Sequence, residues 1–459
     1  MKKLSFRENL GFGSGSLGDS VGYNFIGTFL MFFLTTVAGV EPVAAGTLSA
    51  IGAVWNALCN PVIGYISDRV RTRFGRRRPM IFLFSIPLAI SMLLLFTAVE
   101  IPYGLRPVYY GGMLMIFWTC YTGFFVPYSA LGVEYTSDYN ERTVLRSFAS
   151  FFNMIGSMIT MAVPTAFVEL LTGRGMSVEN AWSAAGGLLG GVTMISIMIT
   201  ALVSASKDPA CKPTEEEKRA AAREKFDILG IFREYVSITR LKPMKYLIIA
   251  SLCALVGYTM IMSDIVYFLT YNQGLSSSEA SLCLMARSGF CIILLPIVNK
   301  AVMVTDKRET LIGAYILGSA GMILVKLAGI ESMGGILVYI ALTAVCGSVY
   351  WQIMPSVFYD VCEYDRAETG LDRQGAIVSF QGLVEAIAAG GGSQLLGIIL
   401  QMAGFDGEAS SQSSGALNWI ENSTTWIPVI FFLISSAALL KYPITRKKYQ
   451  ELLERRENS

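Results

Sequence analysis

Ionisable residues inside apolar stretches are the first candidates for chemistry in this chain of 459 residues. Asp19, Asp264, Arg287 and Glu385 each interrupt a long apolar segment. A charge at the centre of a bilayer costs about 2.5–3.5 kcal/mol on insertion scales, so such residues usually face water or a bound solute. A carboxyl group removed from water also holds a proton more readily, which makes Asp19 and Glu385 candidates for proton exchange. The alternative is that these charges form ion pairs with one another, for example Arg287 with Glu385, and serve only in helix packing.

The residue types that are absent narrow the chemistry further. The chain has no histidine, and therefore lacks the commonest general base and the commonest metal ligand. No nucleophile stands beside a recognisable base either. We therefore expect no enzyme activity, no metal site and no cofactor. The glycine pattern GSGSLG at 13–18 resembles a dinucleotide loop, but it opens an apolar helix and has no strand before it, so we interpret it as close helix packing.

The elements that must position these residues are membrane helices. The chain is 53% hydrophobic and only 15% charged, and apolar stretches of about twenty residues, each long enough to cross a hydrocarbon core of about 30 Å, recur from end to end. The sequence therefore predicts an all-α integral membrane protein with twelve spans, at 9–37, 42–66, 80–101, 108–133, 146–171, 181–205, 246–272, 277–303, 310–328, 331–359, 374–403 and 423–444.

A polar stretch at 206–245 divides the spans into two sets of six. It predicts a lobe at 1–205, a linker at 206–245 with an amphipathic segment, a second lobe at 246–445 and a tail at 446–459. The linker, the tail and alternate loops are rich in Lys and Arg, which favours the cytoplasmic side for them and for both termini. We expect a multi-pass protein of the inner (plasma) membrane. Two six-helix lobes around a cytoplasmic linker are typical of transporters that bind solute near the midplane.

Several motifs resemble a known transporter family. GYISDR at 64–69 is similar to the loop after helix two in the major facilitator superfamily. PYSALGVE at 127–134, DYNERT at 138–143, DVCEY at 360–364 and TGLDRQG at 369–375 resemble the glycoside–pentoside–hexuronide cation symporters, the melibiose permease group. The resemblance implies the major facilitator fold. It also implies gating roles for charged and glycine residues of these loops, which are Gly64, Asp68, Arg69, Glu134, Arg142, Asp360, Glu363 and Arg373.

The cation site of that family is degenerate in this sequence. The family's sodium site uses two helix-two aspartates, a nearby Asn and a helix-four Thr. The matching positions here are Asn56, Asn60, Cys59 and Thr122, of which only Thr122 is retained. Ala386, beside Glu385, replaces the family's helix-eleven lysine. Because a dehydrated hard cation needs anionic oxygens, we expect transport to be proton-coupled or uncoupled.

The resemblance also implies substrate contacts. Asp19 matches the family's helix-one sugar-binding aspartate, Trp351 matches a cavity aromatic, and Tyr121 fits beside them. Gln381 is a further hydrogen-bonding candidate. Phe125 replaces a second sugar-binding aspartate, so melibiose itself is not expected, and the family's helix-five arginine aligns near Ala149 or Ser150.

These observations predict a secondary transporter of a sugar, glycoside or related polar solute that works by alternating access, with H+ as a candidate co-substrate. Membrane lipids are its expected surroundings, nucleic acid is not an expected partner, and a monomer is expected. An amphiphile or lipid carrier of the same fold remains an alternative. A non-transporting membrane sensor is a second alternative, although the short linker and tail offer no signalling domain.

Overall fold

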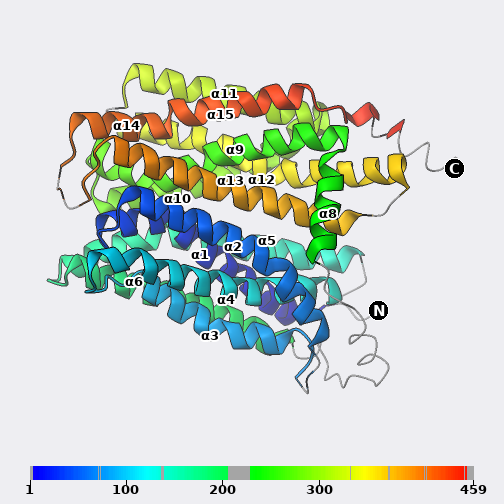
Figure 1. The fold of residues 1–459 in the computed structure, drawn as a ribbon, viewed down its shortest axis with the longest axis horizontal. Helices are drawn as coiled ribbons and strands as arrows, with labels where there is room; N and C mark the ends of the chain where they lie inside the picture. The colour runs from blue at the N-terminus through cyan, green and yellow to red at the C-terminus, as the bar shows by residue number, and fades with distance from the viewer. Residues whose placement is uncertain are drawn as a thin grey trace. The chain divides into compact units, whose positions relative to one another are not determined.

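A computed structural model of the chain describes residues 4–70, 72, 74–135, 139–204, 228–330, 332–370, 373–407, 409, 411–448 and 450–451. Twelve helices in this described part are long and apolar enough to cross a membrane, as the sequence predicts. The chain separates into two compact units (Figure 1). Unit 1 holds the residues up to 226 together with 276–285 and 406–410, and unit 2 holds 227–275, 286–405 and the residues from 411 onward.

Unit 1 is a helical bundle organised around its first helix. That helix starts sharply because Ser5 and Glu8 form a capping box, in which each side chain accepts a hydrogen bond from the other residue's backbone. It packs against α5 and α6, while α4 packs against α2 and α3. The helices of this unit are α1 (Phe6–Thr36), α2 (Pro42–Arg69), α3 (Arg78–Leu95), α4 (Arg106–Glu134), α5 (Tyr139–Thr172) and α6 (Val178–Val203).

Small residues let α1 approach its neighbours closely, as expected from the GSGSLG pattern. A Cβ atom added at Gly15 would lie 2.6 Å from the Tyr128 ring of α4, and one at Gly18 would lie 3.0 Å from the Thr193 carbonyl of α6. A glycine of α5 also lies against α1, because a Cβ at Gly156 would be 2.7 Å from the Leu17 carbonyl oxygen. Backbone approaches this close leave no room for a side chain at the crossing points.

Unit 2 is built around α9, which packs against α12, α13 and α15. The last turn of that span is a π-helix, η3, in which the Gln273 amide donates to the Phe268 carbonyl. The helices of the unit are α8 (Ile228–Thr239), α9 (Lys242–Tyr267), η3 (Phe268–Asn272), α11 (Lys307–Ala328), α12 (Met333–Thr369), α13 (Gln374–Met402), α14 (Ser414–Thr424) and α15 (Trp426–Leu440) (Figure 1). The remaining helix, α10 (Ser277–Val304), begins in unit 1 and continues in unit 2.

The largest differences from the predicted helix boundaries lie in the tenth and the last span. The tenth span was expected to end at 359, but α12 continues to Thr369, because an ion pair of Asp365 supports its polar end and Gly370 terminates it with a φ of +69°. The last span was expected at 423–444, but it begins at Ser414 and breaks at Thr425, so that α14 and α15 are separate helices. Pro428 lacks an amide donor, which is consistent with a new helix start at this point.

Candidate functional site

A carboxylate–phenol pair connects α1 and α4 in unit 1. The Tyr121 hydroxyl donates a hydrogen bond of 2.5 Å to Oδ1 of Asp19. The Asp19 side chain is half-buried. The structure thus brings together two of the residues that the resemblance assigned to sugar recognition. Tyr121 fixes the rotamer of the carboxylate and leaves acceptor capacity for a ligand hydroxyl.

Aromatic rings surround this pair. The ring of Phe125 stacks on that of Tyr121, with centroids 5.7 Å apart and planes 8° apart. Tyr23 lies 6.0 Å from Trp118 and 6.1 Å from Tyr121 between ring centroids. The sequence analysis did not single out Tyr23 or Trp118. Helical spacing in the sequence could have identified both residues. Tyr23 is one helical turn after Asp19 and Trp118 is one turn before Tyr121, so each lies on the same helix face as its partner.

A basic residue near this site was also missed. Arg146 lies on α5, one turn before the Ala149 and Ser150 positions at which the family's arginine was sought. Its charge acts on the hydroxyl of Tyr128, which donates to the Phe12 carbonyl at 3.0 Å and contacts Ser16. The helix register shows that an alignment shifted by one turn would have found this residue.

The positions of the degenerate cation site lie along α2 and α4. The Thr122 hydroxyl donates to Oδ1 of Asn56 at 2.8 Å, so these two residues are in contact as the resemblance implies. Cys59 approaches Thr119 instead, with 3.8 Å between sulfur and oxygen. Asn60 is half-buried on the same face one turn after Asn56. The site therefore offers neutral amide, hydroxyl and thiol groups, and none of these four side chains carries a formal negative charge.

The polar residues of α13 form a chain of hydrogen bonds in unit 2. Gln381 donates from Nε2 to Oε1 of Glu385 at 2.8 Å, and Tyr350 of α12 lies close to the same carboxyl group. The Tyr350 hydroxyl lies 2.6 Å from that of Ser251 on α9. The sequence analysis named Gln381 and Glu385 but did not connect them, and it missed Tyr350 and Ser251.

Trp351 is the exposed aromatic of this region, with 42% of its surface accessible. Tyr258 lies 6.5 Å from it between ring centroids and also sits under the guanidinium of Arg287, 5.6 Å from its ring centroid. Arg287 is 5% exposed, and its Nε has no hydrogen-bond partner. Among the described residues no ion pair joins Arg287 to Glu385, so the packing pair considered from the sequence is not formed.

Asp264 differs from the other intramembrane charges. Its side chain is completely buried in α9, and neither carboxylate oxygen has a hydrogen-bond partner. The sequence analysis expected a charge that faces a cavity or takes part in coupling, and this stays a prediction for a side chain that the structure buries among packed helices.

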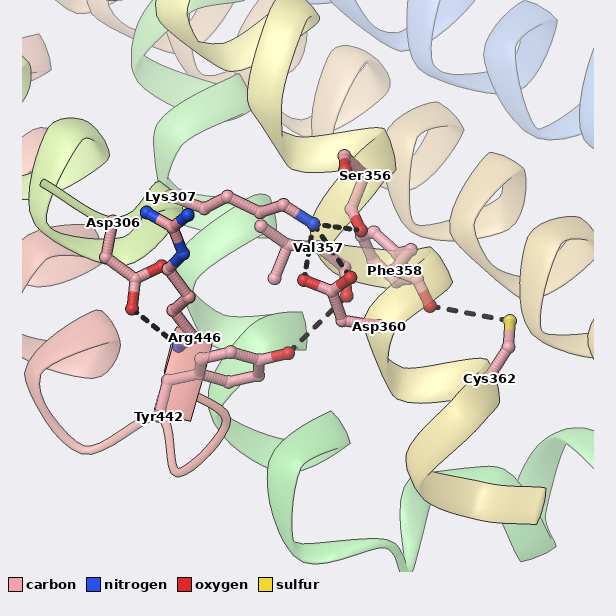
Figure 2. A network of polar contacts seen from close by, with 9 residues as sticks. All are labelled: Asp306, Lys307, Ser356, Val357, Phe358, Asp360, Cys362, Tyr442 and Arg446. Atoms are coloured by element: carbon pink, nitrogen blue, oxygen red, sulfur yellow. Dashed lines mark hydrogen bonds and ion pairs between the residues drawn. The ribbon is translucent and has the colours of Figure 1, made fainter. Parts of the chain in front are cut away.

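A network of charges joins α11, α12 and the segment after α15 (Figure 2). The ammonium group of Lys307 lies 2.7 Å from both carboxylate oxygens of Asp360. Asp306 accepts from the Arg446 amide at 2.8 Å, and the Tyr442 hydroxyl donates to the Val357 carbonyl. Burial, together with the charges of Asp360 and Asp306, raises the pKa of Tyr442, so this phenol remains a neutral donor.

The other residues expected in gating loops make contacts within their own unit. Arg69 donates to the Tyr65 carbonyl at 3.2 Å and lies over its ring, and Gly64 faces Val126 of α4. Arg373 donates from Nε to Asp365 at 2.9 Å and from Nη1 to Ser237 of α8 at 2.8 Å. Glu363 is half-buried on α12. The side chains of Asp68, Glu134 and Arg142 lie outside the described residues.

The sequence matches the family described as MFS/sugar transport protein over residues 11–446, and the chain belongs to this family. The resemblance to the glycoside–pentoside–hexuronide symporters and the expected major facilitator fold are thereby confirmed. The protein is a multi-pass membrane transporter of that family.

Similar proteins include symporters and sugar transporters. The chain is 25% identical to an uncharacterized symporter of Synechocystis sp., with 100% of this chain and 98% of the relative covered. It is 25% identical to the isoprimeverose transporter of Lactiplantibacillus pentosus, with 94% and 88% covered. A solved D-xylose–proton symporter aligns with a TM-score of 0.67 at 15% identity, covering 96% of this chain and 99% of that one, and this shows the shared fold.

Proposed function

We propose that the protein is a secondary transporter of a sugar or glycoside that works by alternating access. The observation that carries the proposal is the Asp19–Tyr121 pair with the rings of Tyr23, Trp118 and Phe125 beside it. A carboxylate oriented by a phenol accepts hydrogen bonds from sugar hydroxyls, and aromatic faces pack against the apolar side of a pyranose ring. Membership of a sugar-transport family and the similarity to an isoprimeverose transporter support the same assignment.

Unit 2 supplies complementary groups in this proposal. Gln381 and Glu385 provide a hydrogen-bonded amide and carboxylate, and Trp351 provides an exposed ring. In this proposal the lobes at 1–205 and 246–445 alternate in the access that they give the solute to the two sides of the membrane. The gating assignment of the loop residues belongs to this proposal, in which Asp360 and Arg373 keep the elements of unit 2 rigid.

Sodium is not part of the proposed cycle. Asn56, Asn60, Cys59 and Thr122 offer no anionic oxygen, and a dehydrated cation gains too little from neutral ligands to offset its lost hydration. We propose coupling to protons, in the inner (plasma) membrane, by a monomer whose termini and linker are cytoplasmic.

A ligand screen tests the substrate class. Purified protein in detergent is heated with free sugars, glycosides, uronides and, as the competing class, lysophospholipids. A ligand that binds only the folded protein at 100 times its Kd stabilises it by about 2.7 kcal/mol. We expect a glycoside to raise the unfolding midpoint in the parent, and to raise it less at the same concentration in Asp19→Asn. Stabilisation by lysophospholipids alone would instead assign the protein to the amphiphile carriers.

A further inference from the structure

The carboxyl group of Asp264 lacks every partner that a buried charge requires. The residue is 0% exposed, and neither Oδ1 nor Oδ2 accepts a hydrogen bond. It lies eight residues before the end of the span at Asn272, about 12 Å from that end at 1.5 Å per residue. Asp19, by contrast, receives a hydrogen bond from Tyr121. Asp264 is thus a second intramembrane carboxyl group, on a different unit from Asp19.

The titratable groups around Asp264 are committed elsewhere. Tyr339 of α12 is close enough to feel its charge, but the Tyr339 hydroxyl donates to the Thr424 carbonyl at 2.8 Å. Lys326 of α11 is engaged by Asn422 and by Glu421 of α14. Arg287 of α10 contacts Tyr258, and neither α13 nor α15 brings a cation to Asp264 in the described part of the chain.

The remaining polar neighbours on the packed helices do not supply a donor either. Ser263, the preceding residue of α9, approaches Ser393 of α13 with 3.5 Å between hydroxyl oxygens. Tyr267 of α9 and Tyr271 of η3 both make T-shaped ring contacts with Phe405. Within the described part of the chain, neither carboxylate oxygen of Asp264 therefore accepts a hydrogen bond.

An ionised carboxylate in such a place is costly. Burying an isolated ionised carboxylate costs far more than burying a neutral polar group, and the usual outcome is that the group takes up a proton. A metal ion is not a fitting occupant, because hard cations take several oxygen ligands. The described residues contain no group of three or more acidic, Cys or His side chains that could hold one.

The backbone beside Asp264 passes from an α-helix into a π-helix. Its carbonyl accepts from the Phe268 amide at the point where α9 passes into the π-helix η3. π-Helical turns are rare and often mark functional sites. The Tyr339 hydroxyl beside it caps the Thr424 carbonyl, where the last span is broken into α14 and α15. Asp264 thus lies one turn before one irregular helix segment, and its neighbour Tyr339 contacts a second one.

We propose that Asp264 is the proton-binding site of this carrier. It takes up one proton from water and is buried as the neutral acid in the conformation described here. It releases that proton to water when the segments around it rearrange and expose it. Proton binding at Asp264 follows from its burial alone, whereas its use for coupling rests on the proposed sugar transport.

Infrared spectroscopy tests proton binding without a substrate. Parent protein in hydrated lipid films at neutral pH should show the carbonyl stretch of a protonated carboxylic acid, with the band shifting in D2O. We expect Asp264→Asn to lose part of this band and Asp264→Glu to retain it at a changed position. The exposed carboxylate variant Glu100→Gln is the matched control and should leave the band unchanged. A folded Asp264→Asn protein with the parent's full band overturns the proposal.

Transport measurements test coupling with the sugar identified in the stabilisation screen. In proteoliposomes the uptake measured with an inward proton gradient is divided by the uptake without one. The ratio should be several-fold in the parent and in Asp264→Glu, and should fall to about one in Asp264→Asn. A parent-like ratio in Asp264→Asn overturns the coupling role. If the parent moves no sugar, the proposed function fails, and the infrared band still decides whether Asp264 holds a proton.

Discussion

At the scale of residues, Asp19 and Asp264 show two ways in which a helix bundle accommodates a carboxyl group. Asp19 receives a hydrogen bond from Tyr121 and lies among aromatic rings, as a group that binds a polyhydroxylated ligand would. Asp264 has no hydrogen-bond partner at all. A hydrogen bond to the charged form favours ionisation, and burial without one disfavours it, so the two residues suit an acceptor and a proton carrier respectively.

The first prediction at this scale concerns Asp19→Asn. The substitution preserves shape but weakens an acceptor whose charge-assisted bonds are worth about 1.5–3 kcal/mol each. We expect a normally folded protein whose affinity for its sugar is at least about tenfold lower, since a loss of about 1.4 kcal/mol in binding free energy raises the Kd tenfold. Titration of the thermal midpoint with ligand measures this. Parent-like affinity would make Asp19 a structural residue.

A second residue-scale prediction is that transport does not require sodium. Asn56 is already engaged by Thr122, and the neighbouring positions offer only neutral groups. Uptake into proteoliposomes should be equal in sodium and choline buffers at the same pH and ionic strength. A several-fold stimulation that saturates with sodium would contradict the interpretation of this site.

At the scale of elements, α1 packs closely against α5 because glycine has no side chain at the crossing point. The predicted variant is Gly156→Ala, whose new Cβ would lie 2.7 Å from the Leu17 carbonyl oxygen and 2.9 Å from the Ser20 Cβ. Overpacking of this kind costs about 1–3 kcal/mol, and a backbone atom cannot move aside as a flexible side chain can. The thermal midpoint in detergent should fall.

The matched control for this packing prediction is Gly191→Ala on α6, where nothing lies within 4 Å of the added Cβ. Alanine favours a helix over glycine by about 0.8–1 kcal/mol, so the control should be neutral or slightly stabilised. Equal effects of the two variants would show that helix propensity, and not the contact with α1, sets the response.

At the scale of the whole molecule, orientation in the membrane follows from the distribution of basic loops. Cys211 lies in the linker and serves as a native probe once the other cysteines are replaced. An impermeant thiol reagent applied to intact cells should leave Cys211 unmodified and should modify Gly104→Cys, at an exposed position in the turn before α4. Efficient labelling of Cys211 in intact cells would reverse the predicted topology.

The sequence by itself determined the twelve spans, because a helix that crosses lipid must satisfy its backbone internally and carry about twenty apolar residues. It also indicated the close packing of α1 and, through quoted motifs, the family. The ends of α12 and the break at Thr425 were not predictable, since caps and ion pairs of neighbouring segments decide them.

Only the tertiary structure decided which polar residues meet. Asp19 contacts Tyr121 across 102 positions, Glu385 bonds to Gln381 and not to Arg287, and Asp264 is left without a hydrogen-bond partner. Hydropathy sets the depth of a residue in the membrane, but the rotation of each helix and the side chains of its neighbours set what that residue touches. Those depend on contacts between distant parts of the chain, which a single sequence does not specify.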